Sequence, residues 1–164
     1  MTADDEHVDL RLVDSERAYR IDLRLISAEK WRVRAALVAQ LADVAVFMQD
    51  CIFTGFHLSV FTDDLKRCHE LLSGCAILAS FDESLMVTVA AVDNGSGLFE
   101  ARLAVRQSDE GNARSLLASL SLEARGITFD QSFLPLLRSE VLEFLRNNDV
   151  DDRNPWTLPA EDAS

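Results

Sequence analysis

Histidine and cysteine side chains are gathered in one stretch of the chain, where they could bind a metal ion. His57, Cys68, His69 and Cys75 all lie within 19 residues. A structural zinc site usually needs closely spaced pairs of Cys or His that chelate the ion from a turn. Cys68 and His69 are adjacent instead, so on a helix their side chains would point about 100° apart. The spacing therefore predicts no metal site.

Nucleophilic catalysis requires a Ser or Cys with a base in reach, and the sequence does not indicate such a pair. Only three histidines occur, and His7 belongs to the polar first residues. No Gly-x-Ser-x-Gly segment is present, and no spacing pairs Cys51 or Cys68 with a histidine. The glycine-rich residues 94–97 lack the Lys-Ser/Thr of a phosphate-binding loop. We therefore predict no catalytic residue and no cofactor.

Carboxylates dominate the charged residues, with 28 Asp and Glu against 16 Lys and Arg and a formal net charge of -12. Three adjacent acidic pairs stand out, namely Asp63 with Asp64, Asp82 with Glu83, and Asp109 with Glu110. Each pair is expected at a helix start or in a turn, where capping, turn formation and solubility account for acidic residues without a special function. A basic protein partner would be attracted to the same groups. These six residues are therefore our candidate partner-binding residues.

The negative charge argues against direct binding to nucleic acid or to an anionic membrane, because both require basic surface. The one basic cluster, residues 30–34, is typical of a strand with charged outward positions. No stretch approaches about 18 apolar residues, and the N-terminus lacks the basic and apolar regions of a signal peptide. Three cysteines among apolar neighbours predict buried reduced thiols rather than disulfides. We therefore expect a soluble cytoplasmic protein.

Alternating apolar residues predict that the chain begins with two strands. Residues 8–12 and 19–25 each place an apolar side chain at every second position, which is the period of a half-buried strand. Residues 31–53 are ambiguous, because their apolar positions fit either a helix or two strands. Valines and aromatic residues favour strands, whereas alanines favour a helix. We predict strands over this segment and keep the helix as the alternative.

A first helix is predicted to follow a short apolar run over residues 56–61. Thr62 would be its N-cap, which places Asp63 and Asp64 in the first turn, where the helix dipole favours carboxylates. Gly74 suits the left-handed position that follows the end of a helix.

The second half of the sequence predicts an antiparallel meander that ends in a helix. Its strands are expected over residues 75–81, 85–91, 99–105 and 116–129. Gly126 marks a bulge in the last of these strands. Asp130 or Ser132 can cap the final helix, and Pro135 falls in the first turn, where its missing N–H costs nothing. The buried stripe of this helix is expected to contain Leu134, Leu137, Val141, Phe144 and Leu145.

These elements predict one α+β domain over residues 1–148, an antiparallel β-sheet meander with two α-helices and the C-terminal helix packed on the sheet. The helices would cover one face of the sheet, and the other face would meet water. Residues 149–164 are acidic, contain two prolines and have no periodicity. We expect them to be a flexible tail, with Trp156 as a contact to the body. The sequence shows no internal repeat.

The order of these motifs resembles that of the WapI-type bacterial immunity proteins. The chain has Phe-Thr-Asp-Asp-Leu at residues 61–65, Leu-Leu-Ser-Gly at 71–74 and Asp-Gln-Ser-Phe-Leu at 130–134. Members of the family commonly show an acidic residue, Gln, a small hydroxyl residue, an aromatic residue and Leu at this last junction. The resemblance covers residues 31–146. It implies a cytoplasmic protein that neutralises a cognate bacterial toxin, often a nuclease, by tight binding.

We therefore predict a non-enzymatic binding protein, namely an immunity protein that occludes a basic toxin domain. A second hypothesis is another interaction module, such as an adaptor or a self-assembling scaffold whose homodimer hides a sheet face. A third is an enzyme with a pocket that the sequence cannot reveal. A toxin gene beside this one would favour the first hypothesis. A strongly shifted carboxylate or histidine in a cleft would favour the third.

Overall fold

A computed structural model gives the fold and describes residues 8–13, 19–41, 44–107, 120–154 and 156. These residues form eight strands and two helices. In chain order they are β1 (Val8–Val13), β2 (Tyr19–Glu29), β3 (Arg32–Leu41), β4 (Val44–Thr54), α1 (Gly55–Leu71), β5 (Cys75–Ala79), β6 (Leu85–Ala91), β7 (Leu98–Gln107), β8 (Leu120–Asp130) and α2 (Phe133–Asn147).

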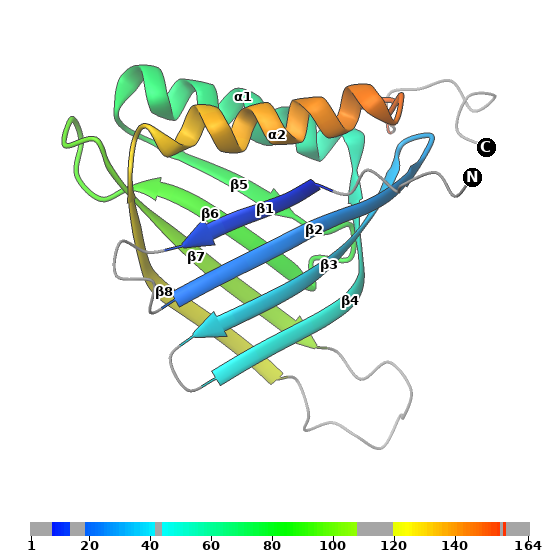
Figure 1. Cartoon of the computed structure of the whole chain (residues 1–164), viewed down its shortest axis with the longest axis horizontal. Coiled ribbons are helices and arrows are strands. Elements are labelled where there is room, and N and C mark those ends of the chain that lie inside the picture. Colours follow the sequence, from blue (N-terminus) through cyan, green and yellow to red (C-terminus); the bar gives the residue numbers. More distant parts are fainter. Residues whose placement is uncertain (1–7, 14–18, 42–43, 108–119, 155, 157–164) are drawn as a thin grey trace.

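The strands form two four-stranded antiparallel sheets, in the orders β1-β2-β3-β4 and β5-β6-β7-β8. The sheets lie one behind the other with their strands crossing, and both helices lie side by side over one end of the pair (Figure 1). The predicted α+β fold with a C-terminal helix on the sheet is confirmed. We expected one sheet with helices over one face and water on the other; instead the strands form two sheets, and each sheet covers the inner face of the other.

The same order of elements, four strands followed by one helix, occurs twice. We call β1–β4 with α1 the first unit, and β5–β8 with α2 the second unit. Each helix packs on a strand of the other unit: α1 packs on β5, and α2 packs on β1. The two helices also pack on each other. The units therefore interlock, although the sequence shows no repeat.

The inner faces of both sheets and of both helices enclose one hydrophobic core. On β2, alternate residues Ile21, Leu23 and Leu25 are buried, as a half-buried strand requires. Removing one such side chain from water contributes about 1.5–3 kcal/mol. The strand prediction for residues 31–53 is confirmed, because β3 buries Val33 and Leu37 by the same alternation.

The first helix begins earlier than predicted, at Gly55 instead of after Thr62. Its N-cap is Thr54, whose side-chain oxygen accepts a hydrogen bond from the backbone N–H of His57 at 3.0 Å. The apolar run that we predicted to precede the helix is therefore part of it.

Apolar spacing explains this early start. Leu58, Phe61 and Leu65 recur at intervals of three and four residues and are all buried, so they form one helical stripe against the core. Thr62 lies on the buried side as well, and its hydroxyl donates to the carbonyl of Ser59 at 2.7 Å inside the helix. A threonine bonded in this way is a helix-interior residue and not a cap.

The second helix agrees with the prediction. Ser132 is its N-cap but makes no side-chain capping bond. The carboxylate of Asp130 accepts a hydrogen bond from the backbone N–H of Ser132 at 2.8 Å, and so orders the entry to the helix. All five residues of the predicted stripe are buried.

The chain beyond α2 returns to the start of α1. The backbone N–H of Val150 donates to the carbonyl of Leu145, and that of Asp151 donates to the carbonyl of Lys30, both at 3.0 Å. A Cβ added to Gly55 would lie 2.4 Å from the Asp151 carbonyl oxygen, so only glycine fits there. The predicted flexible tail is thus docked in its first residues, and residues 157–164 lie outside the described part.

The cysteines follow the prediction at two positions of three. Cys51 and Cys68 are buried, but Cys75 is exposed, and all three are free thiols. Cys75 begins β5 on the side that faces away from the core, next to the buried Ala76. Within the described residues, neither helix combines the length and the apolar character needed to cross a membrane.

Candidate protein-docking surface

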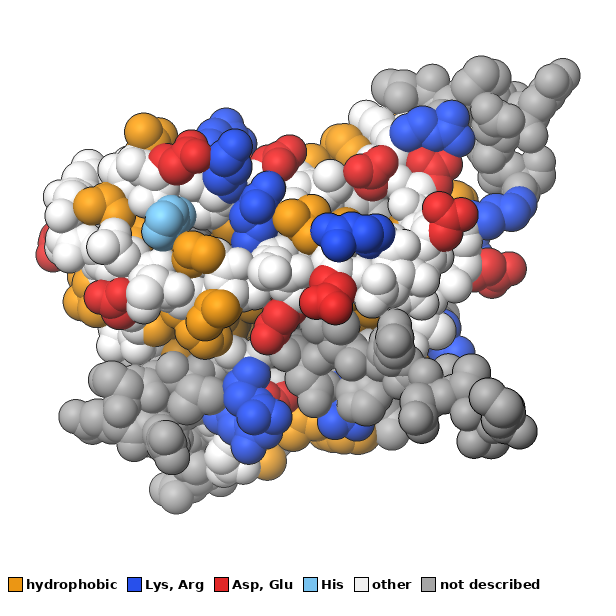
Figure 2. Space-filling model, turned by 45° about the horizontal axis from the view of Figure 1, so that its top comes forward, with side chains coloured by type: hydrophobic (Ala, Val, Ile, Leu, Met, Phe, Trp, Pro, Cys, Tyr) orange, Lys and Arg blue, Asp and Glu red, His pale blue; other side chains and the backbone are white. Residues whose placement is uncertain are grey.

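The four predicted partner-binding residues that the structure describes lie on two different elements, α1 and the turn between β5 and β6. Asp63 and Asp64 lie inside α1 instead of in its first turn, and Asp64 forms an ion pair with Arg67. Figure 2 shows acidic, basic and hydrophobic side chains intermixed over the helical end of the molecule. Asp109 and Glu110 lie outside the described residues.

The second acidic pair lies in the turn between β5 and β6, where Asp82 organises the backbone. Its Oδ1 accepts hydrogen bonds from the hydroxyls of Ser80 and Ser84, both at 2.7 Å, and from the Ser84 backbone N–H at 3.1 Å. Burial alone would raise the pKa of Asp82, but these bonds outweigh it and hold the pKa below its usual value. Glu83 is exposed beside it, with a left-handed φ of 57°.

Next to this turn, a backbone hydrogen bond joins the two sheets. The N–H of Phe81 donates to the carbonyl of Ile52, on the open edge of β4, at 2.7 Å. The Phe81 ring also lies 6.1 Å from the ring of Trp31, in the β2–β3 turn, at an angle of 50°. Tilted aromatic pairs of this kind are stabilising. The Arg32 guanidinium packs 4.7 Å from the centre of the Trp31 ring.

We call Trp31, Ile52, Phe81, Asp82 and Glu83 the corner surface. Phe81 is 53% exposed and Ile52 is 38% exposed, so apolar area is presented to solvent beside two carboxylates. The sheet-to-sheet hydrogen bond and the Asp82 hydrogen bonds hold these residues in place. A fixed aromatic anchor with a polar border is the usual centre of a protein–protein interface. The corner surface therefore presents a fixed, partly exposed aromatic ring with two carboxylates at its border.

The thiol behind the corner surface is suited to packing and not to catalysis. Cys51 is buried, and this burial, followed by the negative charges of Asp82 and Asp50, raises its pKa to about 11. A thiol with so high a pKa stays protonated at neutral pH, and the protonated form is a poor nucleophile. Asp50 itself forms an ion pair with Arg34 on the outer face of the first sheet.

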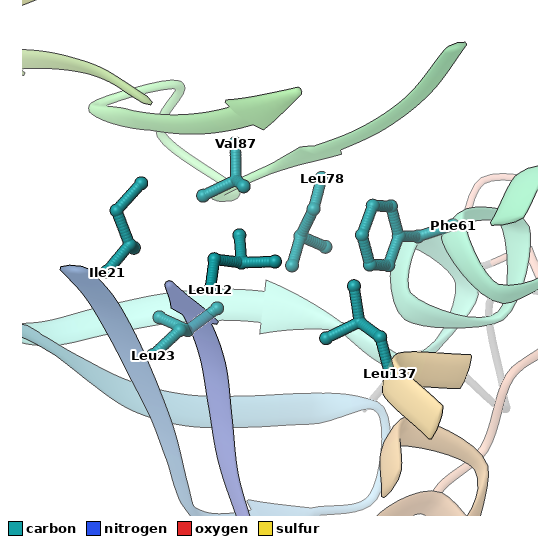
Figure 3. Close-up of a pocket in the computed structure, with 7 residues that line it drawn as sticks. All are labelled: Leu12, Ile21, Leu23, Phe61, Leu78, Val87 and Leu137. Carbon is teal, nitrogen blue, oxygen red and sulfur yellow. The ribbon is translucent and has the colours of Figure 1, made fainter. Parts of the chain in front are cut away.

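The core contains a small cavity that is too small for a substrate. It is lined only by apolar side chains from both sheets and both helices, among them Leu12, Phe61 and Leu137 (Figure 3). The centre of a water molecule could move within about 10 Å³ there. An apolar space of this size has room for one water molecule and offers it no hydrogen bond, so it stays dry.

Burial lowers the pKa of His57 below its usual value. Its Nδ1 is buried without a hydrogen-bond partner, and its ring lies 5.8 Å from Phe56 and 5.7 Å from Trp156. This aromatic packing attaches Trp156 to the start of α1. In the described ranges, no three His, Cys, Asp or Glu side chains are grouped so as to hold a metal ion.

Sequence reasoning missed the aromatic part of the corner surface. Phe81 and Trp31 are 50 positions apart in the sequence, and only the crossing of the two sheets brings them together. The alternation of β5 contains a usable signal when it is continued beyond Ala79, because Ala76, Leu78 and Ser80 are buried and Phe81 then falls on the outward side. An outward aromatic next to an acidic turn could have been singled out on that basis.

Comparison with known proteins gives no match: no family model, no curated protein and no solved structure is similar to this chain. The resemblance to the WapI-type immunity proteins therefore stays a prediction.

Proposed function

We propose that the chain is a non-enzymatic binding protein that docks a protein partner at the corner surface. The observation that carries the proposal is the half-exposed Phe81 ring, packed on Trp31 and bordered by the carboxylates of Asp82 and Glu83. Aromatic residues that are already held in their bound position lose little conformational freedom on binding, so they contribute strongly to affinity.

The specific form of this proposal is an immunity protein that neutralises a bacterial toxin by covering it. The sequence resemblance supports this role, and so does the net charge of -12, which would attract a basic toxin domain. Such attraction must weaken with salt, because the Debye length falls from about 30 Å at 0.01 M to about 3 Å at 1 M. The aromatic contact would hold the complex after the encounter.

A capture experiment with matched variants tests the docking surface. Tagged protein is incubated with lysate of the source organism at low and at high salt, and bound proteins are identified by mass spectrometry. We expect one stoichiometric basic partner, captured more at low salt. Phe81→Ser should reduce its affinity about 10-fold or more, as expected for an interface anchor. Leu136→Ser is the control, because Leu136 on α2 is similarly exposed, at 61%, and lies on another element.

Growth then tests the immunity role separately. The captured protein is expressed alone, with the wild-type chain, and with the Phe81→Ser variant. We expect growth arrest in the first case, rescue in the second and weaker rescue in the third. Equal capture by both variants would exclude the corner surface as the docking site. A captured partner that is harmless when expressed alone would exclude the immunity role and favour an adaptor.

A further inference from the structure

The chain beyond α2 forms a strap that crosses the start of α1. We call residues 150–154 together with Trp156 the strap. It fills the space above Gly55, where an added Cβ would lie 2.4 Å from the Asp151 carbonyl oxygen and 2.6 Å from a methyl carbon of Val150. One turn further along α1, the Ser59 hydroxyl lies 3.5 Å from a carboxylate oxygen of Asp152. The strap is therefore closely seated on α1.

The strap also holds the turn between β2 and β3. The backbone N–H of Asp151 donates to the carbonyl of Lys30, which has a left-handed φ of 53°. The carbonyl of the next residue, Trp31, accepts from the backbone N–H of Gly55 at 2.8 Å. A non-glycine residue keeps a left-handed backbone only where surrounding contacts impose it. The strap is one of the two contacts that fix the turn carrying Trp31.

The far end of the strap is anchored by an aromatic contact with a histidine. The ring of Trp156 lies 5.7 Å from the ring of His57, at an angle of 47°. His57 Nδ1 is buried, and no residue that the structure describes bonds to it. His57 stands in the first turn of α1, where the helix dipole disfavours a positive charge. A proton added to this ring would therefore be poorly accommodated while the strap is docked.

The charged groups around His57 do not remove this difficulty. The segments packed there carry both signs of charge, namely Lys30 in the β2–β3 turn, Arg146 and Asp149 at the end of α2, and Asp151, Asp152 and Arg153 on the strap. Asp151 is ion-paired with Arg153 at 2.7 Å, and the first turn of α1 holds no acidic residue. Burial, and not one of these charges, lowers the pKa of His57.

We propose that protonation of His57 releases the strap and loosens the β2–β3 turn. Both ring nitrogens of a protonated histidine are donors, and water can accept from Nδ1 once the strap has left. Because burial holds the pKa of docked His57 below 6.5, the neutral form favours docking. This preference is fully present above about pH 6.5 and is lost progressively as the pH falls below that value.

The release of the strap is independent of the proposed function, because every contact in it lies within one chain. It bears on the corner surface all the same. The turn that the strap holds carries Trp31, whose ring packs on Phe81. Acid would therefore loosen the support of the Phe81 ring without any change at the ring itself.

Hydrogen exchange and NMR of the full chain, at about pH 7.5 and about pH 5.5, test the release on either side of the ordinary histidine pKa. Exchange rates are divided by those of an unstructured peptide at the same pH. The protection of the Asp151 amide should fall about 5-fold or more in acid. Amides of Phe61 and Leu65, in the middle of α1, should keep theirs. The indole N–H signals of Trp156 and Trp31 should shift together over the same pH range.

Three variants assign the effect. His57→Phe keeps an aromatic ring that cannot be protonated, so the Asp151 amide should stay protected in acid. His69→Phe is the matched control, because His69 is an exposed histidine of the same helix, and it should behave as the wild type. Gly55→Ala places a Cβ against the strap and should leave the Asp151 amide unprotected at both pH values.

Equal protection of the Asp151 amide at both pH values in the wild type would overturn the release. A fall that persists in His57→Phe would overturn the role of His57. An unchanged Trp31 signal while Asp151 loses protection would overturn the coupling to the turn. Circular dichroism confirms that each variant is folded. If His57→Phe is unfolded, His57→Leu takes its place with the same outcomes.

Discussion

The two units of the molecule have the same order of elements but different outer faces. On the first sheet, outward positions carry charged residues and large exposed hydrophobic ones, such as Val38, Phe47 and Ile52. On the second sheet, the outward positions of β6 and β7 are mostly half-buried, and small residues such as Thr88, Ala90 and Ala104 stand there beside the charged Glu100 and Arg102. The inner faces are alike, because both are apolar and buried in one core.

This difference separates what builds the fold from what is available for binding. The inner faces must be apolar in both units, since each sheet covers the other. The outer faces are not needed for packing, and the first unit presents Val38 and Phe47 there, both exposed. The docking site that we propose lies where the first sheet meets the turn between β5 and β6.

The largest expected loss of stability follows from truncating a buried phenylalanine. Two phenylalanines at equivalent positions allow this loss to be compared between the units. Phe53 and Phe129 are each the last residue but one of the fourth strand of their unit, and Phe53 is fully buried whereas Phe129 is 8% exposed. Phe53→Ala should lower the free energy of unfolding by about 3–5 kcal/mol. Phe129→Ala should cost less, because its site at the margin can refill with water. Urea denaturation measures both losses, and equal losses would show that the units share the core equally.

The thiols provide a comparison of inner and outer positions. Near pH 8, Cys75 should react at once with a thiol reagent, because it is exposed. Cys51 should react about 100-fold more slowly than an ordinary thiol, since a pKa of about 11 instead of 9.0 leaves far less thiolate. Its reaction should accelerate as the pH rises towards that value. Rapid reaction of two or more thiols per folded chain would contradict the burial of Cys51 and Cys68.

The smallest expected loss of stability follows from removing an N-cap side chain. The N-caps of α1 and α2 allow this loss to be compared between the units. Thr54→Ala removes the hydrogen bond to the His57 N–H and should lower the free energy of unfolding by about 1 kcal/mol. Ser132→Ala removes a side chain that makes no capping bond, so its effect should stay within about 0.5 kcal/mol. Thermal denaturation of both variants is the measurement. A larger loss for Ser132→Ala would mean that its hydroxyl caps α2 in solution.

Local pattern was sufficient for most elements of the fold. Period-two alternation located the strands, and the Leu134–Leu145 stripe located the final helix, because each depends on neighbours in sequence. The start of α1 was misplaced, since Thr54 and Thr62 are both acceptable caps and only burial of Thr62 distinguishes them. The helix continues through residues 56–61 because the core, and not the cap preference, fixes which face is buried.

Local pattern could have singled out Phe81, but it could not predict the corner surface as a whole. It depends on the crossing of two sheets, which places the turn after β5 against the end of β4. The acidic pairs were visible in the sequence, but Asp64 pairs with Arg67 and Asp82 binds its own turn. Residue type alone does not reveal these contacts. The sequence therefore could not show which carboxylates are already bonded within the chain.

The docking of Asp151 on Lys30 has a consequence for how the chain is synthesised. A ribosome makes the first unit first, but α1 packs on β5, β1 packs on α2, and the space at Gly55 is filled by Val150 and Asp151, which are translated after α2. The first sheet must therefore leave the exit tunnel with its apolar inner face uncovered and wait for the rest of the chain. Nascent chains stalled before β5 should bind chaperones, and release should coincide with emergence of the C-terminal residues.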